Sequence, residues 1–289
     1  MPIAERGYIH WDGELLERRR PWLPITRQGI RLAFKRKYFK FSFFVSLVPA
    51  FGFLVGIYAA EKIQDFKLKI EGVSTILQVN PGFFRAYFAG DFLLFMMLML
   101  MVLSGAGLIA DELRHNALQL YFARPLTKKD YFMGKAAILV FFLSLVTVVP
   151  GLVFIICKLI FSGSFRFLAD YPWIGLSVIG FSALVTAFFS FYTLMISSVS
   201  KNRRYTAILL FTIYIFSDVL FGIFYASFRN PYFALLSIKA NLQQVGAAFF
   251  NVKAPYAVSW IYSLAVLLTL CAVSAFILHK RVKGVEVIK

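Results

Sequence analysis

The chain has 289 residues, of which 60% are apolar and 16% charged, and its mean hydropathy is +0.74. Soluble domains contain roughly half apolar and about a quarter charged residues, so this composition rules out a disordered chain and argues against a soluble globular domain. A polytopic membrane protein is indicated, and six spans of about 20 residues each fit the length with modest loops and no large soluble domain.

Charge and metal-ligand chemistry narrow the function further. The formal net charge is +17, which in a soluble protein would suggest nucleic acid. In a membrane protein, Lys and Arg are retained on the cytoplasmic side and anionic headgroups offset them, so no nucleic-acid partner is expected. Cys157 and Cys271 lie in apolar runs and predict packing residues. The three histidines lack a Cys or His at ligand spacing, so no metal site is expected.

Residues 1–40 form a polar, basic N-terminal region without the apolar run of a secretory signal peptide. The stretch 18–24 predicts a charged linker broken by prolines. From Thr26 the apolar side chains of Ile30, Phe34 and Tyr38 share one helical stripe, with basic residues on the other faces. This pattern favours a basic amphipathic helix at the membrane surface over a charged tail without fixed structure.

Six apolar runs predict the membrane domain, residues 41–278. The predicted spans are about 41–60, 92–110, 136–161, 173–199, 205–228 and 256–278, followed by a tail, 279–289. Segment 61–90 predicts a polar loop. Segment 229–256 is too short for two spans, which leaves a short amphipathic helix or a re-entrant hairpin. Gly52 and Gly56 permit close helix contact, although such spacing is common by chance. Lys158, near the end of its span, is predicted to reach the interface.

The distribution of basic residues predicts the orientation. The N-terminal region, segment 111–135, connector 200–205 and the C-terminal tail together hold 22 of the 31 Lys and Arg residues. The positive-inside rule therefore places both termini in the cytoplasm, as an even number of spans requires. We expect a multi-pass membrane protein.

Segment 111–135 is the most informative polar stretch. Asp111 and Glu112 end the second span, and apolar residues then recur at helical spacing as far as Tyr121. Arg124-Pro125 ends this short helix, because a residue before proline is pushed out of the α region. Thr127 predicts the cap of a new helix, with Asp130 as capping partner. The residues alone allow a helix that takes force from a soluble partner or an ordinary amphipathic connector.

The same segment resembles the region after the second span of ABC-2 type permeases, the membrane subunits of ABC transporters. That family shows an acidic residue, a small helix, a turn of the form (S/A)RP(L/I)(S/T)(R/K), and "GK" opening the next helix. The matching residues are Asp111-Glu112, Asn116-Ala117-Leu118, Ala123-Arg124-Pro125-Leu126-Thr127-Lys128-Lys129, Tyr131 and Gly134-Lys135. Asn116-Ala117 departs from the more usual Gly-Thr. The motif covers about 25 residues, and the six spans match the type V exporter architecture.

The resemblance implies that this chain is a non-catalytic permease subunit of a bacterial inner membrane, driven by ATP hydrolysis on a separate ATPase subunit, with export as the expected direction of transport. ATP and Mg would be bound by that partner and no cofactor by this chain. A second copy of the chain and membrane lipids would complete the assembly, and an accessory periplasmic protein is left open. The residues implied in ATPase coupling are Asp111, Glu112, Arg114, Asn116, Ala117, Leu118, Gln119, Arg124, Pro125, Lys128, Lys129, Lys201, Arg203 and Arg204.

The sequence has no common nucleotide-binding or hydrolase motif, and it has one acidic residue near the middle of a predicted span. No G-x-x-x-x-G-K-[ST], G-x-S-x-G or H-E-x-x-H occurs, so ATP binding by a P-loop and common hydrolytic chemistry are not expected. Asp218, near the middle of the fifth span, is a candidate for the transport path, or it is protonated or bonded to Ser217 or a tyrosine. Alternatives to the permease are an ion- or proton-coupled carrier or channel, a lipid-modifying membrane enzyme, and a structural subunit. No residue specifies the substrate.

Overall fold

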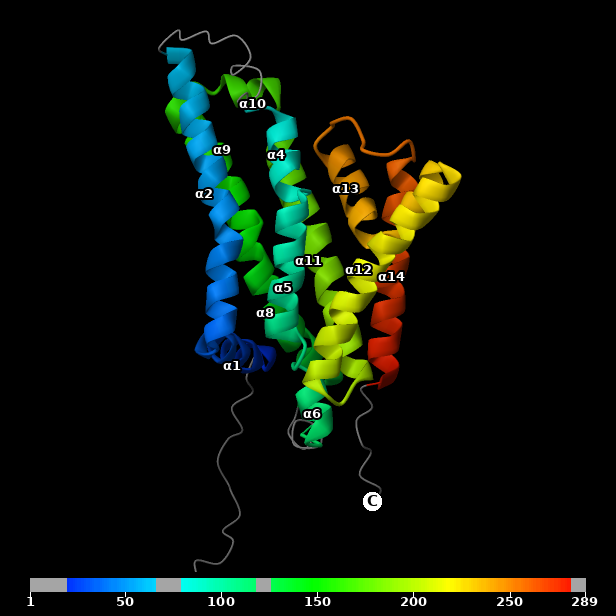
Figure 1. Cartoon of the computed structure of the whole chain (residues 1–289). Helices are drawn as coiled ribbons and strands as arrows, with labels where there is room; N and C mark the ends of the chain where they lie inside the picture. The colour runs from blue at the N-terminus through cyan, green and yellow to red at the C-terminus, as the bar shows by residue number, and fades with distance from the viewer. Residues whose placement is uncertain (1–19, 66–78, 118–125, 282–289) are drawn as a thin grey trace, which may run out of the picture.

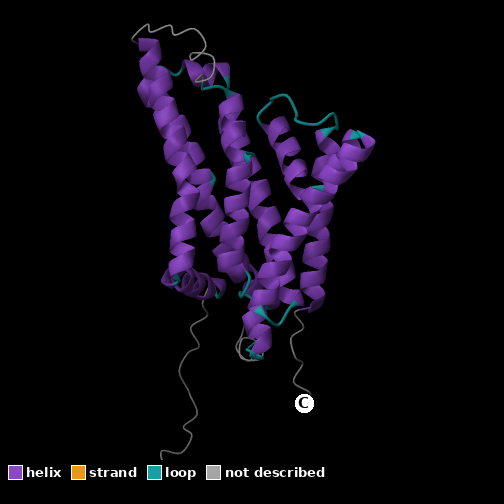
Figure 2. Cartoon of the chain, viewed as in Figure 1, coloured by secondary structure: helices purple, strands orange, loops and turns teal. Residues whose placement is uncertain are grey.

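The computed structural model describes residues 20–65, 79–117 and 126–281. Within these ranges the regular elements are all helices (Figures 1 and 2). Six helical stretches are long and apolar enough to cross a membrane: Lys37–Lys62, Pro81–Arg114, Lys128–Ser162, Ile174–Val199, Arg203–Phe228 and Trp260–Arg281. The predicted all-α class and the six spans are thereby confirmed at the level of helix length and composition, as expected of a multi-pass membrane protein.

Helix α1 (Trp22–Lys35) lies across one end of the bundle, and α2 (Lys37–Asp65) rises from it (Figure 1). Thr26 and Ala33 are buried, whereas Arg27 and Arg31 are exposed, so an amphipathic helix is confirmed over Trp22–Lys35. The prediction is wrong for Tyr38, which was placed on the same stripe but lies in α2 and is exposed, because the chain turns at Arg36. Helix α1 begins at Trp22, inside the predicted linker. Pro24 does not prevent this, because the first N–H groups of a helix have no intrahelical partner to lose.

The second span is longer and less regular than the predicted 92–110. It consists of α4 (Pro81–Phe88), α5 (Asp91–Gly105) and α6 (Ala110–Arg114). The predicted loop 61–90 is therefore wrong for its last residues, and also for 61–65, which continue α2. α4 starts inside that loop because Asn80 caps it, accepting a hydrogen bond from the Phe83 N–H at 3.1 Å. Pro81 follows at a position where proline is well tolerated.

The break between α5 and α6 is satisfied by one side chain of α11 (Ile174–Val199). The buried hydroxyl of Ser197 accepts hydrogen bonds from the N–H groups of Ile109 and Ala110, at 3.0 and 3.1 Å, and donates to the Ala106 carbonyl at 3.0 Å. Irregular backbone at membrane depth needs such partners, because lipid offers none. Ser197 therefore fixes α6 to the central helix α11.

Ser197→Ala is expected to lower the apparent unfolding temperature in detergent. Two N–H groups and a carbonyl lose their buried partner, and leaving such groups unsatisfied costs about 1–3 kcal/mol each. Ser198→Ala is the matched control, because its hydroxyl donates only within its own helix, to Met195. Equal midpoints for the two variants in fluorescence-detected size-exclusion melts would show that Ser197 does not hold the break.

The third span, predicted as continuous over 136–161, is broken at Thr147 into α8 (Lys128–Val146) and α9 (Val148–Ser162). Pro150 explains the break, because a proline ring clashes with the carbonyl four residues earlier, here that of Val146. The freed carbonyl accepts a hydrogen bond from the Tyr87 hydroxyl at 2.8 Å. A side chain of α4 thus compensates the break in the neighbouring span.

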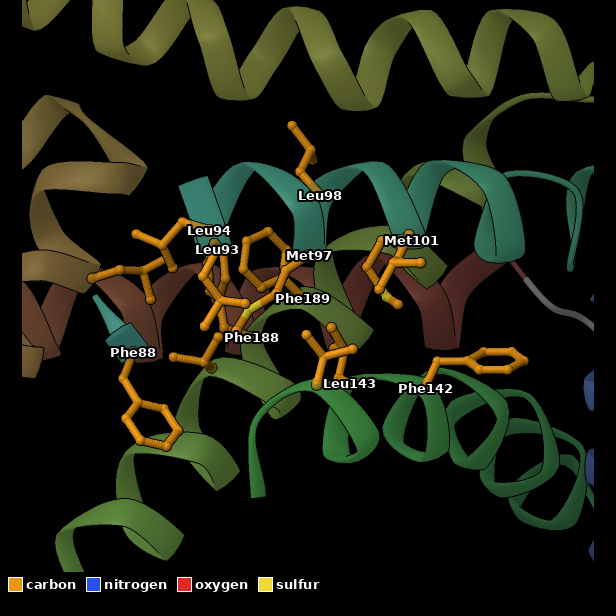
Figure 3. Close-up of a cluster of buried hydrophobic side chains, with 14 of the residues drawn as sticks. Phe88, Leu93, Leu94, Met97, Leu98, Met101, Phe142, Leu143, Phe188 and Phe189 are labelled. Carbon is orange, nitrogen blue, oxygen red and sulfur yellow. The ribbon is translucent and has the colours of Figure 1, made fainter. Parts of the chain in front are cut away.

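The core lies where α5, α8 and α11 meet. Figure 3 shows Met97 of α5, Leu143 of α8 and Phe188 of α11 within one cluster of buried apolar side chains. These three side chains are almost fully buried. By contrast, α2, α12 (Arg203–Phe228) and α14 (Trp260–Arg281) keep most of their apolar surface exposed, as expected of helices that face lipid or a further subunit.

Two smaller predictions about the end opposite α1 are wrong. Lys158 does not extend to the interface, because its ammonium pairs with the Glu61 carboxylate of α2 and lies over the Phe167 ring of α10 (Arg166–Asp170). Gly52 and Gly56 make no close helix contact among the described residues: a Cβ at Gly52 would meet nothing within 4 Å, and one at Gly56 only a ring edge.

Segment 229–256 forms a re-entrant pair. The short 3-10 helix η1 (Pro231–Leu236) runs back along α12, and α13 (Ile238–Phe249) returns to the end from which the segment came (Figure 1). The turn between them contacts Asp218, ten residues before the end of α12. At 1.5 Å per residue this is a depth of about 15 Å. Both predicted alternatives, amphipathic helix and re-entrant hairpin, therefore apply to this segment.

Candidate functional site

The predicted coupling segment projects from the α1 end of the bundle as α6 and the turn that follows it (Figure 1). Of its predicted site residues, Arg114 and Asn116 are exposed and Ala117 is half-buried. Lys128 and Lys129, at the start of α8, are also exposed. Leu118, Gln119, Arg124 and Pro125 lie outside the described residues.

The helix predicted as far as Tyr121 is interrupted, because α6 ends at Arg114 and a turn follows over 115–117. The remainder of that predicted helix lies outside the described residues. Asn116 adopts a left-handed backbone with φ of 53°, which asparagine tolerates better than most residues. The Ala117 N–H then donates to the Glu112 carbonyl at 2.9 Å, the six-to-one bond of a helix C-terminal motif. The Asn116-Ala117 pair, which departs from the family pattern, therefore forms a defined turn at the tip of α6.

Glu112 is directed into the protein and joins α6 to α8. Its two carboxylate oxygens accept hydrogen bonds from the Tyr131 hydroxyl and the Lys135 ammonium, both at 2.5 Å. The Lys135 and Glu112 side chains are only 7% and 14% exposed. Of the two acidic residues predicted for coupling, Glu112 can therefore act on a partner only by holding α6 in position.

Two further features of the motif are explained by packing at the start of α8. Thr127 and Asp130 form the predicted capping box, in which the Asp130 N–H donates to the Thr127 hydroxyl at 3.2 Å. Gly134 lies under α1: a Cβ there would approach the Ile25 Cβ to 2.9 Å, and the Gly134 carbonyl accepts a hydrogen bond from Thr26 at 3.1 Å. The glycine of the "GK" pair thus permits the close contact between α1 and α8.

The connector between α11 and α12 meets α6 at the same end. Lys201 and Arg204 are exposed, whereas Arg203 is half-buried beside Gly107 and Asp111. Arg203 donates to the Leu103 carbonyl at 3.3 Å, and Arg36, at the corner between α1 and α2, donates to the same oxygen at 3.1 Å. Burial and the nearby Arg203 charge lower the pKa of Arg36, against an opposing effect of Asp111. Sequence analysis did not single out Arg36.

A second polar cluster surrounds Asp218. Its carboxylate accepts a hydrogen bond from Ser237 at 2.9 Å and lies 2.8 Å from the Lys239 ammonium. Lys239 is also 3.4 Å from Asp91, at the start of α5, and Gln243 donates to Asp91 at 2.9 Å. The predicted partners of Asp218, Ser217 and a tyrosine, are therefore replaced by residues of α13.

The missed residues Lys239 and Gln243 had a signal in the sequence. They lie four residues apart, on one face of a helix that also carries Asn241 and Gln244. Asp91 is 74% exposed at the start of α5, whereas the Asp218 and Lys239 side chains are 32% and 26% exposed. The cluster therefore joins α5, α12 and α13 while leaving one carboxylate open on the surface of the monomer.

No group of three or more His, Cys, Asp or Glu side chains in the described part of the chain could hold a metal ion. Both cysteines are free and half-buried. Comparison with models of known protein families finds no match to the chain, and comparison with curated proteins finds no significant relative. The two polar clusters and the fold are therefore the features of the chain that bear on its function.

Proposed function

We propose that this chain is the membrane-spanning permease subunit of an ABC transporter of the ABC-2 type, and that α6 with its terminal turn is the coupling element that docks on a separate ATPase subunit. The observation that carries the proposal is a projecting polar turn with a rigid attachment to the bundle. Arg114 and Asn116 are exposed at its tip, while Glu112, two residues before Arg114, is locked to α8.

The attachment of α6 to the bundle would transmit movements of the ATPase to the membrane-spanning helices. Glu112 joins it to α8, and Ser197 joins the preceding backbone to α11. A displacement of the tip therefore moves two core spans instead of bending a loop. Such a bundle can be shifted between two packed arrangements by an ATPase that closes and opens. ATP and Mg belong to that partner, and this chain performs no catalysis.

The proposal includes the orientation and the assembly. α1 and the last residues of α14 lie at the same end as α6 (Figure 1). The basic residues Lys128, Lys129, Lys201 and Arg204 are exposed at that end, which supports a cytoplasmic location for it and for both termini. Two copies of the chain in a bacterial inner membrane, with two ATPase subunits, would form the transporter.

The second candidate function is an ion- or proton-coupled carrier, and the cluster around Asp218 favours it. Ionisable side chains at membrane depth mark transport pathways in many membrane proteins. Within the permease proposal, the same cluster is the candidate transport path. The two functions differ in whether a soluble ATPase is required.

Copurification distinguishes them. The tagged chain, purified in mild detergent, is expected to retain a soluble subunit with a P-loop sequence. Arg114→Glu is expected to reduce that retention about tenfold, because like-charge contacts at an interface cost more than 1.4 kcal/mol. Arg114 is preferable to Asn116, where substitution would strain the left-handed turn. Arg166→Glu, exposed on α10 at the opposite end, is the control. Pure chain without an ATPase across several detergents would favour the carrier.

A further inference from the structure

A cavity of 220 Å³ lies beneath α1, against the last turn of α5 and the start of α6. Its lining combines apolar side chains, among them Ile25, Leu32 and Leu108, with the charged side chains of Arg36, Asp111, Glu112 and Lys135. Its volume exceeds the space of a single water molecule several times. Leu32 is exposed, so the cavity is accessible from the surface of α1.

The polar part of the cavity lining has an excess of hydrogen-bond donors. The guanidinium of Arg36, which lines the cavity, and that of Arg203, which lies beside the lining residue Gly107, converge on the Leu103 carbonyl. Among the described residues each guanidinium makes that one hydrogen bond. A guanidinium carries five N–H donors, so most donors of this pair remain available. Among the described acids Asp111 lies near both, while the two oxygens of Glu112 are occupied by Tyr131 and Lys135. Two positive charges therefore face one carboxylate.

The position of the cavity beneath α1 indicates which class of ligand would reach it. α1 exposes Arg27, Arg31 and Lys35 beside buried Thr26 and Ala33, the pattern of a helix that lies in the headgroup region. A cavity under such a helix is at the depth of lipid phosphates. Arginine binds phosphate oxygens through paired N–H groups, and the apolar lining residues suit the start of an acyl chain.

We propose that this cavity binds the phosphate group of an anionic membrane lipid, with Arg36 as the direct ligand and Arg203 beside it. A lipid bound there would rest on α1, α5 and α6 at once. The same chemistry could be supplied by a free phosphate ion, and the apolar lining residues favour the lipid. The proposal does not depend on the transport function.

The test is native mass spectrometry of the full chain, exchanged into detergent with phosphatidylglycerol or phosphatidylcholine. The wild type is expected to retain one phosphatidylglycerol per chain. Arg36→Gln is expected to need about tenfold more lipid for half occupancy, since a hydrogen bond to a charged group is worth about 1.5–3 kcal/mol. Arg31→Gln, which removes the same charge from the exposed side of α1, is the control and should bind as the wild type does.

Two further measurements decide the outcome. Leu32→Trp narrows the cavity at an exposed position and keeps both arginines, so it is expected to lower lipid occupancy. This variant tests the proposal even if Arg36→Gln does not fold. Equal retention by wild type, Arg36→Gln and Leu32→Trp would overturn the proposal, as would equal losses in Arg36→Gln and Arg31→Gln. Displacement of the lipid by millimolar inorganic phosphate would assign the site to a free phosphate ion and overturn the lipid assignment.

Discussion

Glu112→Ala is expected to lower the stability of the bundle more than changes at the exposed residues Arg114, Lys128 and Lys129 of the predicted coupling segment. The substitution removes the acceptor shared by the Tyr131 hydroxyl and the Lys135 ammonium, both of which lie in the protein interior. Removing one partner of a buried ion pair costs about 3–5 kcal/mol, because the Lys135 ammonium loses the carboxylate that offsets its charge in the interior. We expect a fall of several degrees in the unfolding midpoint in detergent.

The same variant separates a structural role from a docking role. Arg114→Ala changes the exposed side of the same short helix and is expected to leave the midpoint unchanged while weakening retention of the ATPase. Glu112→Gln keeps an acceptor for Tyr131 and should be intermediate in stability. If Glu112→Ala unfolds at the same temperature as the wild type, α6 is not anchored through this carboxylate. The proposed rigid connection between α6 and α8 would then be wrong.

The sequence predicts the number of spans correctly because apolar runs of sufficient length are a strong signal. It predicts the breaks poorly because hydropathy averages over them. Pro150 is a local signal that could have located the break at Thr147. The break before α6 is different, since its backbone groups depend on Ser197, which lies far away along the chain. Nothing near the break indicates that partner.

The charged residues show the same limit. Sequence analysis considered Asp218 and Lys158 one at a time, whereas each is paired in the fold. Lys158 meets Glu61 from another span, and Asp218 meets Lys239 from the re-entrant helix α13. Pairing of buried charges is set by which helices become neighbours, and the apolar pattern of a span does not specify its neighbours. The cap of α8 by Thr127 and Asp130, by contrast, is formed by residues close together in the sequence, and its prediction is confirmed.

The second large effect is expected at Asp218. Asp218→Asn keeps the shape of the side chain but removes the charge that Lys239 contacts at 2.8 Å, so α13 loses its ionic attachment to α12. In reconstituted vesicles, the transport rate is expected to fall to a small fraction of the wild-type rate, while the proposed ATPase subunit still copurifies. Unchanged transport would remove Asp218 from the transport path.

The pairing itself can be measured without knowing the substrate. Lys239→Met leaves Asp218 and Asp91 facing each other without their shared cation, so it should destabilise the chain more than Asp218→Asn does. The double variant Asp218→Asn with Lys239→Met should recover part of the loss, giving a coupling of about 1 kcal/mol, within the range for residues in contact. Asp91→Asn is the control, because its carboxylate is 74% exposed and exposed pairs contribute little. Additive effects at Asp218 and Lys239 would mean that α13 is held by its caps and packing alone. The position of α13 would then not depend on its ion pair with Asp218 of α12. The charges of this cluster would also not explain the selectivity of a transport path.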